Sequence, residues 1–126
     1  INGQQFIIKD CSNASIYLLD NINTVTVDDC TACTIVIGPT SGSVFLRECS
    51  ECVVVVACGQ FRTRDCRQLQ VRLLCNTQPI IEASTRMQMA CYQLYYPQLQ
   101  GQFASAGLSV FNNNWSDVHD FTPTDN

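Results

Sequence analysis

The sequence predicts an all-β domain built as a solenoid of stacked strands. An acidic residue followed by cysteine recurs at steps of 19, 19 and 17 residues, with β-branched residues alternating on both sides of each pair. A repeat of this length is too short for two helices, and it fits one coil of a solenoid whose parallel strands stack about 4.8 Å apart. The recurring pairs are Asp10-Cys11, Asp29-Cys30, Glu48-Cys49 and Asp65-Cys66.

Apolar rows mark the positions expected to face the interior of each coil. They lie five residues before each cysteine, and three and five residues after it. Equivalent residues should stack as ladders in a narrow core, while the acidic residues sit at a bend and cap local turns. The rows are Phe6, Val25, Val44 and Phe61, then Ala14, Cys33, Cys52 and Leu69, then Ile16, Ile35, Val54 and Val71.

The repeat predicts coils over residues 1–91 and a cap with a tail over residues 92–126. The pattern weakens after Cys75, and Met87, Met89 and Cys91 are expected to form one last coil. A cap is expected because the open end of a solenoid exposes unpaired strand backbone. Turns are predicted at Asp20-Asn21, Gly38-Pro39, Ser41-Gly42 and Asn112 to Asn114, a short helix at Gln98 to Ala106 before Gly107, a strand at Leu108 to Phe111, and a frayed tail at Thr122 to Asn126.

Length and composition restrict the function classes. A chain of 126 residues makes a single domain, and a net charge of −4 argues against general binding to nucleic acid or anionic membrane. No run of 18 apolar residues occurs, so no membrane span is expected. Nine cysteines at repeat positions suit packed thiols in a reducing compartment. The cysteines therefore indicate the cytoplasm. We also expect a monomer, because partner binding and the cap account for the low proportion of charged residues.

The cysteine spacing leaves two interpretations open. Cys30-x-x-Cys33 and Cys49-x-x-Cys52 match the spacing of a structural zinc site. Packed core thiols explain the same rows, which also accept an apolar residue at the second position, and this is the favoured interpretation. No metal site is therefore predicted. No glycine-rich phosphate loop is present, so no nucleotide cofactor of its own is expected.

Three basic side chains, Arg62, Arg64 and Arg67, fall within six residues of an acidic and apolar chain. On an extended strand, Arg62 and Arg64 share the face opposite Phe61. Arg62 interrupts a largely apolar ladder, whose earlier members are Ile7, Thr26 and Phe45, and its guanidinium fork suits phosphate oxygens. For Arg64 and Arg67, a solvated strand face or pairing with Asp65 and its neighbours explains the pattern equally well. The isolated Glu82 is better explained as a solvated surface charge.

The chain resembles the tubulin-binding cofactor C domain family in order along essentially its whole length. The resemblance implies a right-handed parallel β-helix. The stretches that carry it are Gly3-Gln4-Gln5-Phe6, the acidic residue-cysteine pairs, Gln60-Phe61-Arg62, Arg64-Asp65-Cys66-Arg67, Thr77 to Glu82, Tyr95-Tyr96-Pro97, Phe111-Asn112-Asn113, Trp115-Ser116 and His119-Asp120-Phe121.

The resemblance also implies activation of an Arf-like small GTPase in its GTP form, or an action on tubulin. The GTPase itself would bind GTP and Mg²⁺. The family's arginine finger falls on Arg62 and a neighbouring functional glutamine on Gln60. The family's contacts with the partner fall on Glu82 and Phe121. Arg64 and Arg67 are further candidate contacts.

One departure from the family pattern keeps an alternative open. Gly59 stands where the family often has a second glutamine. If that glutamine helps to hold the arginine finger or the catalytic glutamine of the GTPase, its absence reduces activity and leaves binding intact. The alternative is a scaffold that holds a small GTPase or tubulin without accelerating hydrolysis. The implied location is the cytoplasm, at the ciliary base or at the cytoplasmic face of the plasma membrane.

Overall fold

The chain winds into a parallel solenoid, as the repeat predicts. The computed structural model describes residues 4–19, 22–92, 101–102, 106–108, 113, 116 and 118–120. The strands are β1 (Gln4–Lys9), β2 (Ser15–Leu18), β3 (Ile22–Asp28), β4 (Thr34–Arg47), β5 (Val53–Arg64), β6 (Gln70–Cys75), β7 (Ile80–Glu82), β8 (Gln88–Cys91) and β9 (His119–Asp120).

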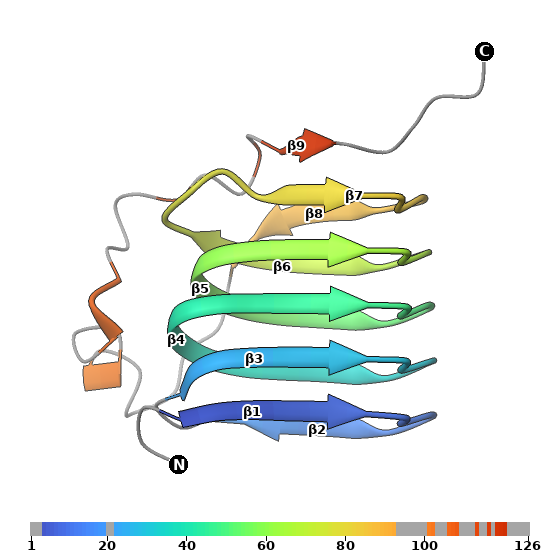
Figure 1. The fold of residues 1–126 in the computed structure, drawn as a ribbon, viewed down its shortest axis with the longest axis horizontal. Coiled ribbons are helices and arrows are strands. Elements are labelled where there is room, and N and C mark those ends of the chain that lie inside the picture. Colours follow the sequence, from blue (N-terminus) through green and yellow to red (C-terminus); the bar gives the residue numbers. More distant parts are fainter. Residues whose placement is uncertain are drawn as a thin grey trace.

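Two layers of strands face each other across the core (Figure 1). The front layer contains β1, β3, β7 and the second halves of β4 and β5, and all of its strands point the same way. The rear layer contains β2, β6, β8 and the first halves of β4 and β5. In this view the front strands run to the right while the chain rises from coil to coil, so the solenoid is right-handed.

The strand register confirms the predicted ladders. Phe6 pairs with Val25, Val25 with Val44, and Val44 with Phe61, and each neighbour lies one coil further along. The inward ladders form a core cluster that includes Ile35, Val54 and Val71, each with no exposed surface. Small thiols and β-branched side chains therefore fill most of the narrow interior, together with a few larger residues such as Leu46 and Phe61.

The predicted turns at Gly38-Pro39 and Ser41-Gly42 are wrong. Both dipeptides lie inside β4, which runs without a break around the edge of the solenoid. Its pairing register shifts between Ile37 and Thr40 and again between Thr40 and Ser43, so the four residues occupy irregularities within one strand. Bulges of this kind bend a strand and let it remain in the ladder. The turn predicted at Asp20-Asn21 lies outside the described residues.

The bend at each acidic residue is confirmed, and its geometry is the same in every coil. The acidic residue and the residue three positions later both have positive φ, as at Asp10 (56°) and Asn13 (53°). A fifth corner without the acidic residue-cysteine pair has this geometry at Ala83 and Arg86. Five corner residues are joined by parallel bridges: Ser12, Thr31, Ser50, Arg67 and Thr85.

The last coil and part of the C-terminal region follow the expectation. Strand β8 pairs with β6, with Met89 opposite Val71, and β9 pairs with the open edge of β7. Strand β9 therefore covers the open end of the solenoid. Leu108, in contrast, packs against Ala57 and Leu74 on the side of the solenoid. The predicted helix and the strand and turn after it lie mostly outside the described residues, and the tail lies entirely outside them. Among the described residues, no helix is both long and apolar enough to cross a membrane.

Candidate functional site

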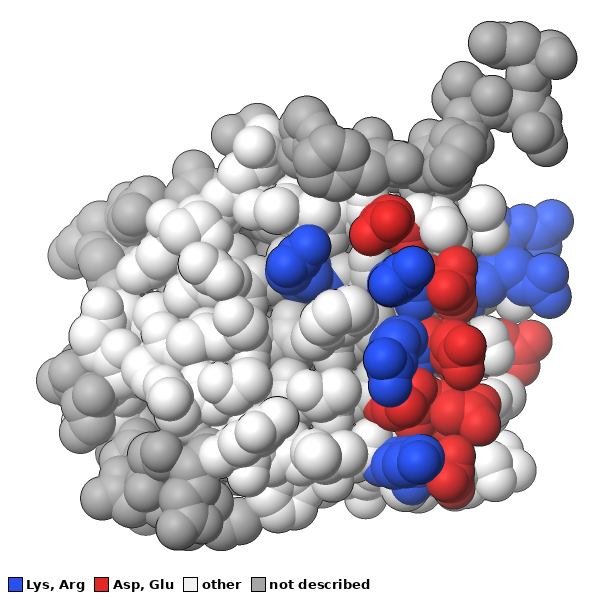
Figure 2. All heavy atoms as spheres, in the orientation of Figure 1, with Lys and Arg blue, Asp and Glu red and all other residues white. Residues whose placement is uncertain are grey.

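The outer face of the front layer carries two contrasting rows of side chains. Figure 2 shows a band of opposite charges on one side of this face and an isolated basic side chain over its uncharged part. Strand pairing defines both rows, because residues in register stack from coil to coil. The first row is Ile7, Thr26, Phe45, Arg62 and Ile80, and the second is Lys9, Asp28, Arg47, Arg64 and Glu82.

Arg62 projects from this face between two apolar neighbours. Strand β5 alternates here between exposed Gln60 and Arg62 and buried Phe61, as predicted. The guanidinium carbon lies 5.9 Å from the centre of the Phe45 ring in the coil below, and Ile80 pairs with Arg62 in the coil above. No described carboxylate forms an ion pair with Arg62. The guanidinium therefore keeps its charge available for a ligand or partner.

Gln60 shares the exposed face of β5 with Arg62 and is held from the coil below. The Ser43 hydroxyl donates a hydrogen bond of 3.1 Å to Oε1 of Gln60. This bond limits the rotation of the amide and leaves its NH₂ group able to donate to another molecule. A pocket of about 290 Å³ opens beside both side chains and is lined by Gln60, Phe61, Arg62, Thr77, Gln78 and Ile80.

Gly59 lies where the backbones of adjacent coils approach closely. A Cβ atom added to Gly59 would lie 2.7 Å from the carbonyl oxygen of Ser41. The Gly59 carbonyl accepts a hydrogen bond of 2.8 Å from the Thr77 hydroxyl, which ties β5 to the loop that leads into β7. A glutamine at this position would require the backbone to move, so the chain is locally adapted to glycine.

Arg64 and Glu82 lie in the charged row beside Arg62, and they are in register with each other. The ion pair described in this row joins Arg47 and Asp28, whose Nη2 and Oδ2 atoms are 2.8 Å apart. The hydrogen bond from Arg47 lowers the pKa of Asp28. Among the described residues Arg64 forms no ion pair, so the pairing with Asp65 considered above is not found.

The structure thus brings Gln60, Arg62, Arg64 and Glu82 onto one face. Arg67 is exposed but lies beyond the corner, where it forms bridges with Ser50 and Thr85. It therefore stands apart from this set. The predicted contact at Phe121 lies outside the described residues.

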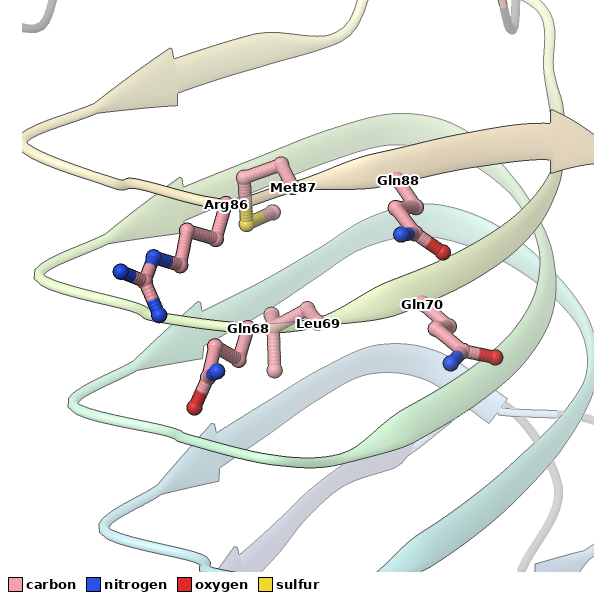
Figure 3. Close-up of a pocket in the computed structure, with 6 residues that line it drawn as sticks. All are labelled: Gln68, Leu69, Gln70, Arg86, Met87 and Gln88. Atoms are coloured by element: carbon pink, nitrogen blue, oxygen red, sulfur yellow. The ribbon is translucent and has the colours of Figure 1, made fainter.

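A larger pocket, of about 500 Å³, lies at the corner between the fourth and fifth coils (Figure 3). Figure 3 shows its residues as two stacked rungs, with Arg86 above Gln68 and Gln88 above Gln70. Arg86 is the charged residue in its lining. The described residues of its lining include neither an acid-base pair nor a nucleophile.

The cysteines of the repeat stabilise the corners of the solenoid. Each thiol donates to the carbonyl oxygen two residues before it, at sulfur-oxygen distances of 3.3 to 3.5 Å. In the fifth coil the Ser84 hydroxyl makes the same bond to Glu82, at 2.9 Å. At the first of the two cysteine positions, each of the five described coils therefore places a small side chain with a hydrogen-bond donor. The thiols concerned are those of Cys11, Cys30, Cys33, Cys49, Cys52 and Cys66.

This arrangement favours packed thiols over zinc ligands. Burial raises the pKa of Cys30 to about 12 and that of Cys52 to about 11. Hydrogen bonding with Cys66, together with burial, raises the pKa of Cys49. In the metal-free domain these thiols are protonated near neutral pH and pack as small apolar groups. Within the part of the chain that the structure describes, no group of three or more potential ligands gathers as a metal site would require.

Thiol labelling of the native protein should therefore show three classes of cysteine. At pH 8, we expect Cys91, which is exposed, to react rapidly with an aromatic disulfide reagent, and half-buried Cys11 to react more slowly. The other seven are buried and should react only after unfolding. Cys91→Ser should remove the fast phase. Rapid reaction of more than two thiols in the folded protein would contradict this assignment.

Three residues around Arg62 are not among the predicted site residues. Ser43 holds Gln60, Thr77 holds the Gly59 carbonyl, and Gln78 lines the pocket. Ser43 and Thr77 lie 17 and 18 residues from Gln60 and Gly59, which they support, and this separation is one coil. The repeat period was therefore the signal in the sequence that could have identified Ser43 and Thr77 as supports.

A family model described as "Tubulin binding cofactor C" matches residues 3–121. Protein XRP2 from Gallus gallus is 69% identical over 123 residues, covering 98% of this chain and 34% of the relative. The Homo sapiens protein of the same name is 65% identical, with coverages of 98% and 35%. Tubulin-specific chaperone C from Homo sapiens is 35% identical over 121 residues, with coverages of 96% and 35%. The chain thus spans about a third of these relatives.

A solved structure has the same fold. Tubulin Binding Cofactor C from Leishmania major superimposes with a TM-score of 0.78 over 94% of this chain and 88% of that one. Sequence identity is 20%. The likeness supports the solenoid architecture and carries no argument about activity.

Proposed function

The chain belongs to the tubulin binding cofactor C family, and we propose that it activates GTP hydrolysis by an Arf-like small GTPase. The observation that carries this proposal is the environment of Arg62. This exposed cation lies between apolar Phe45 and Ile80 and pairs with no described carboxylate. A side chain of this kind suits an arginine finger, which enters the active site of a partner GTPase.

In the proposed mechanism, Arg62 stabilises the transition state of hydrolysis in trans. Negative charge spreads over the oxygens of the transferring phosphoryl group, and a guanidinium fork neutralises it with several hydrogen bonds. Arginine fingers accelerate hydrolysis by roughly 10³- to 10⁵-fold, which corresponds to about 4 to 7 kcal/mol of barrier. The partner holds the nucleotide, the metal ion and the attacking water, so this domain needs no nucleotide site.

The solenoid supports this role because it fixes the backbone around Arg62 in advance. Strand β5 is hydrogen-bonded to coils on both sides, so docking orders little more than side chains. Gln60 is held by Ser43 on the same face and can contact the loop of the partner that orients its catalytic water. Glu82 and Arg64 supply opposite charges at the rim of the face, where they can guide the partner's orientation.

A second candidate is a binding module that holds its partner without accelerating hydrolysis. Gly59 favours it, because the family often has a glutamine at this position and the structure has no room for one without movement of the backbone. The partner in this case is a small GTPase or tubulin. Tubulin is considered because a relative 35% identical to this chain bears the name tubulin-specific chaperone C.

Single-turnover hydrolysis decides between the two candidates. An Arf-like GTPase loaded with GTP is mixed with increasing amounts of the domain, and released phosphate is measured beside a binding titration. We expect the rate to rise by at least about 10³-fold at saturation. Saturable binding with an unchanged rate would overturn the activator and leave the binding module. A parallel titration with tubulin tests the other partner.

A further inference from the structure

Phe45 occupies an unusual place on the proposed binding face. It lies in the third coil, in register with Arg62, and its side chain is half-buried outside the main core cluster. On the same strand, the outward neighbours on either side are Ser43 and Arg47, which are polar. The interaction found for the ring is with Arg62, whose guanidinium carbon lies 5.9 Å from the ring centre.

An aromatic ring restrains an arginine differently from a carboxylate. An ion pair would use the N–H groups of the guanidinium and neutralise the charge that a phosphoryl group needs. The face of an aromatic ring attracts the cation through its quadrupole and leaves the N–H groups free to donate in the guanidinium plane. A ring in cation-π contact can therefore hold Arg62 in place without competing for its ligand.

We propose that Phe45 is a positioning residue, whose ring holds the Arg62 side chain in the orientation that enters the partner's active site. The inference rests on the proposed function, and it adds a residue one coil away from the finger. Ile80 is in register with Arg62 on the opposite side and lines the pocket beside it. Contact with the Phe45 ring restricts the rotation of the Arg62 side chain, so less of its rotational freedom is lost on docking.

Phe45→Leu tests this role, because leucine keeps apolar packing and removes the aromatic face. We expect the hydrolysis rate at saturating domain to fall by about two- to fivefold, the factor expected for an exposed cation-π contact. The concentration that gives half of the maximal rate should change less than twofold. Phe45→Tyr should restore the rate. Ile7→Ala, an exposed residue of the same row two coils below Phe45, is the matched control and should leave the rate unchanged.

A double mutant separates positioning from general damage. When Phe45→Leu is combined with Arg62→Ala, which keeps the affinity for the GTPase, the leucine should cause no further loss of affinity, because it acts through Arg62. A clear further loss of affinity in the double mutant, a wild-type rate for Phe45→Leu, or an effect of Phe45→Leu confined to affinity would each overturn the positioning role.

A spectroscopic measurement tests the contact without any GTPase. In the free domain, the ring should shift the NMR signals of the Arg62 side-chain protons upfield. Phe45→Leu should remove that shift and Phe45→Tyr should keep it. Signals unaffected by the substitution would overturn the inference. If the shift behaves as expected but the wild-type domain accelerates no hydrolysis, the proposed function fails while the restraint on Arg62 stands.

Discussion

Arg62→Ala should abolish the acceleration of GTP hydrolysis, a loss of roughly 10³- to 10⁵-fold, and leave the affinity for the GTPase within a few-fold of wild type. The different effects on rate and on affinity follow from the geometry. Arg62 is one exposed side chain on a face where Gln60, Arg64 and Glu82 remain available to the partner. Its charge matters most when negative charge develops during phosphoryl transfer, so its removal raises the barrier more than it weakens the complex.

Single-turnover rates and a binding titration, made on the same preparations, check this prediction. Arg62→Lys should recover a small part of the acceleration, because lysine keeps the charge and loses the planar fork. Arg72→Ala is the matched control, since Arg72 is an exposed arginine on the rear layer of the solenoid. A variant lacking Arg62 that still accelerates hydrolysis would show that another group supplies the charge.

The solenoid was predictable from the sequence because each coil repeats the same chemistry. The row from Phe6 to Phe61 and the corners at the acidic residues follow from spacing alone. The continuous bend of β4 did not, because Gly38-Pro39 and Ser41-Gly42 resemble ordinary turns in sequence. Whether such residues end a strand or only bulge it depends on hydrogen bonds from neighbouring coils, which local sequence does not encode.

The candidate site was predictable in part. Alternation along β5 places Gln60 and Arg62 on one face, and the resemblance to the family added Glu82. The supports from adjacent coils, Ser43 and Phe45, were not recognised as parts of the site. In the sequence, Phe45 is one member of a largely apolar ladder, and its contact with the guanidinium depends on side-chain positions that a repeat does not specify.

Phe61→Ala should have the largest effect on stability, and it contrasts with Phe45 one coil below. Phe61 is 1% exposed and packs in the main core cluster. Replacing a buried phenylalanine by alanine costs about 3 to 5 kcal/mol, because apolar contacts are lost and a cavity remains. In a domain whose unfolding free energy is of the order of 5 to 15 kcal/mol, that loss is a large fraction of the total.

Urea unfolding of Phe61→Ala, Phe61→Leu and Phe45→Leu measures the contrast directly. We expect a markedly lower midpoint for Phe61→Ala, a smaller loss for Phe61→Leu, and a midpoint close to wild type for Phe45→Leu. At temperatures where it is fully folded, Phe61→Ala should still accelerate hydrolysis, because its neighbours Gln60 and Arg62 remain on the outer face. If Phe45→Leu proved as destabilising as Phe61→Ala, Phe45 would belong to the core, and its effect on the rate would follow from damage to the fold.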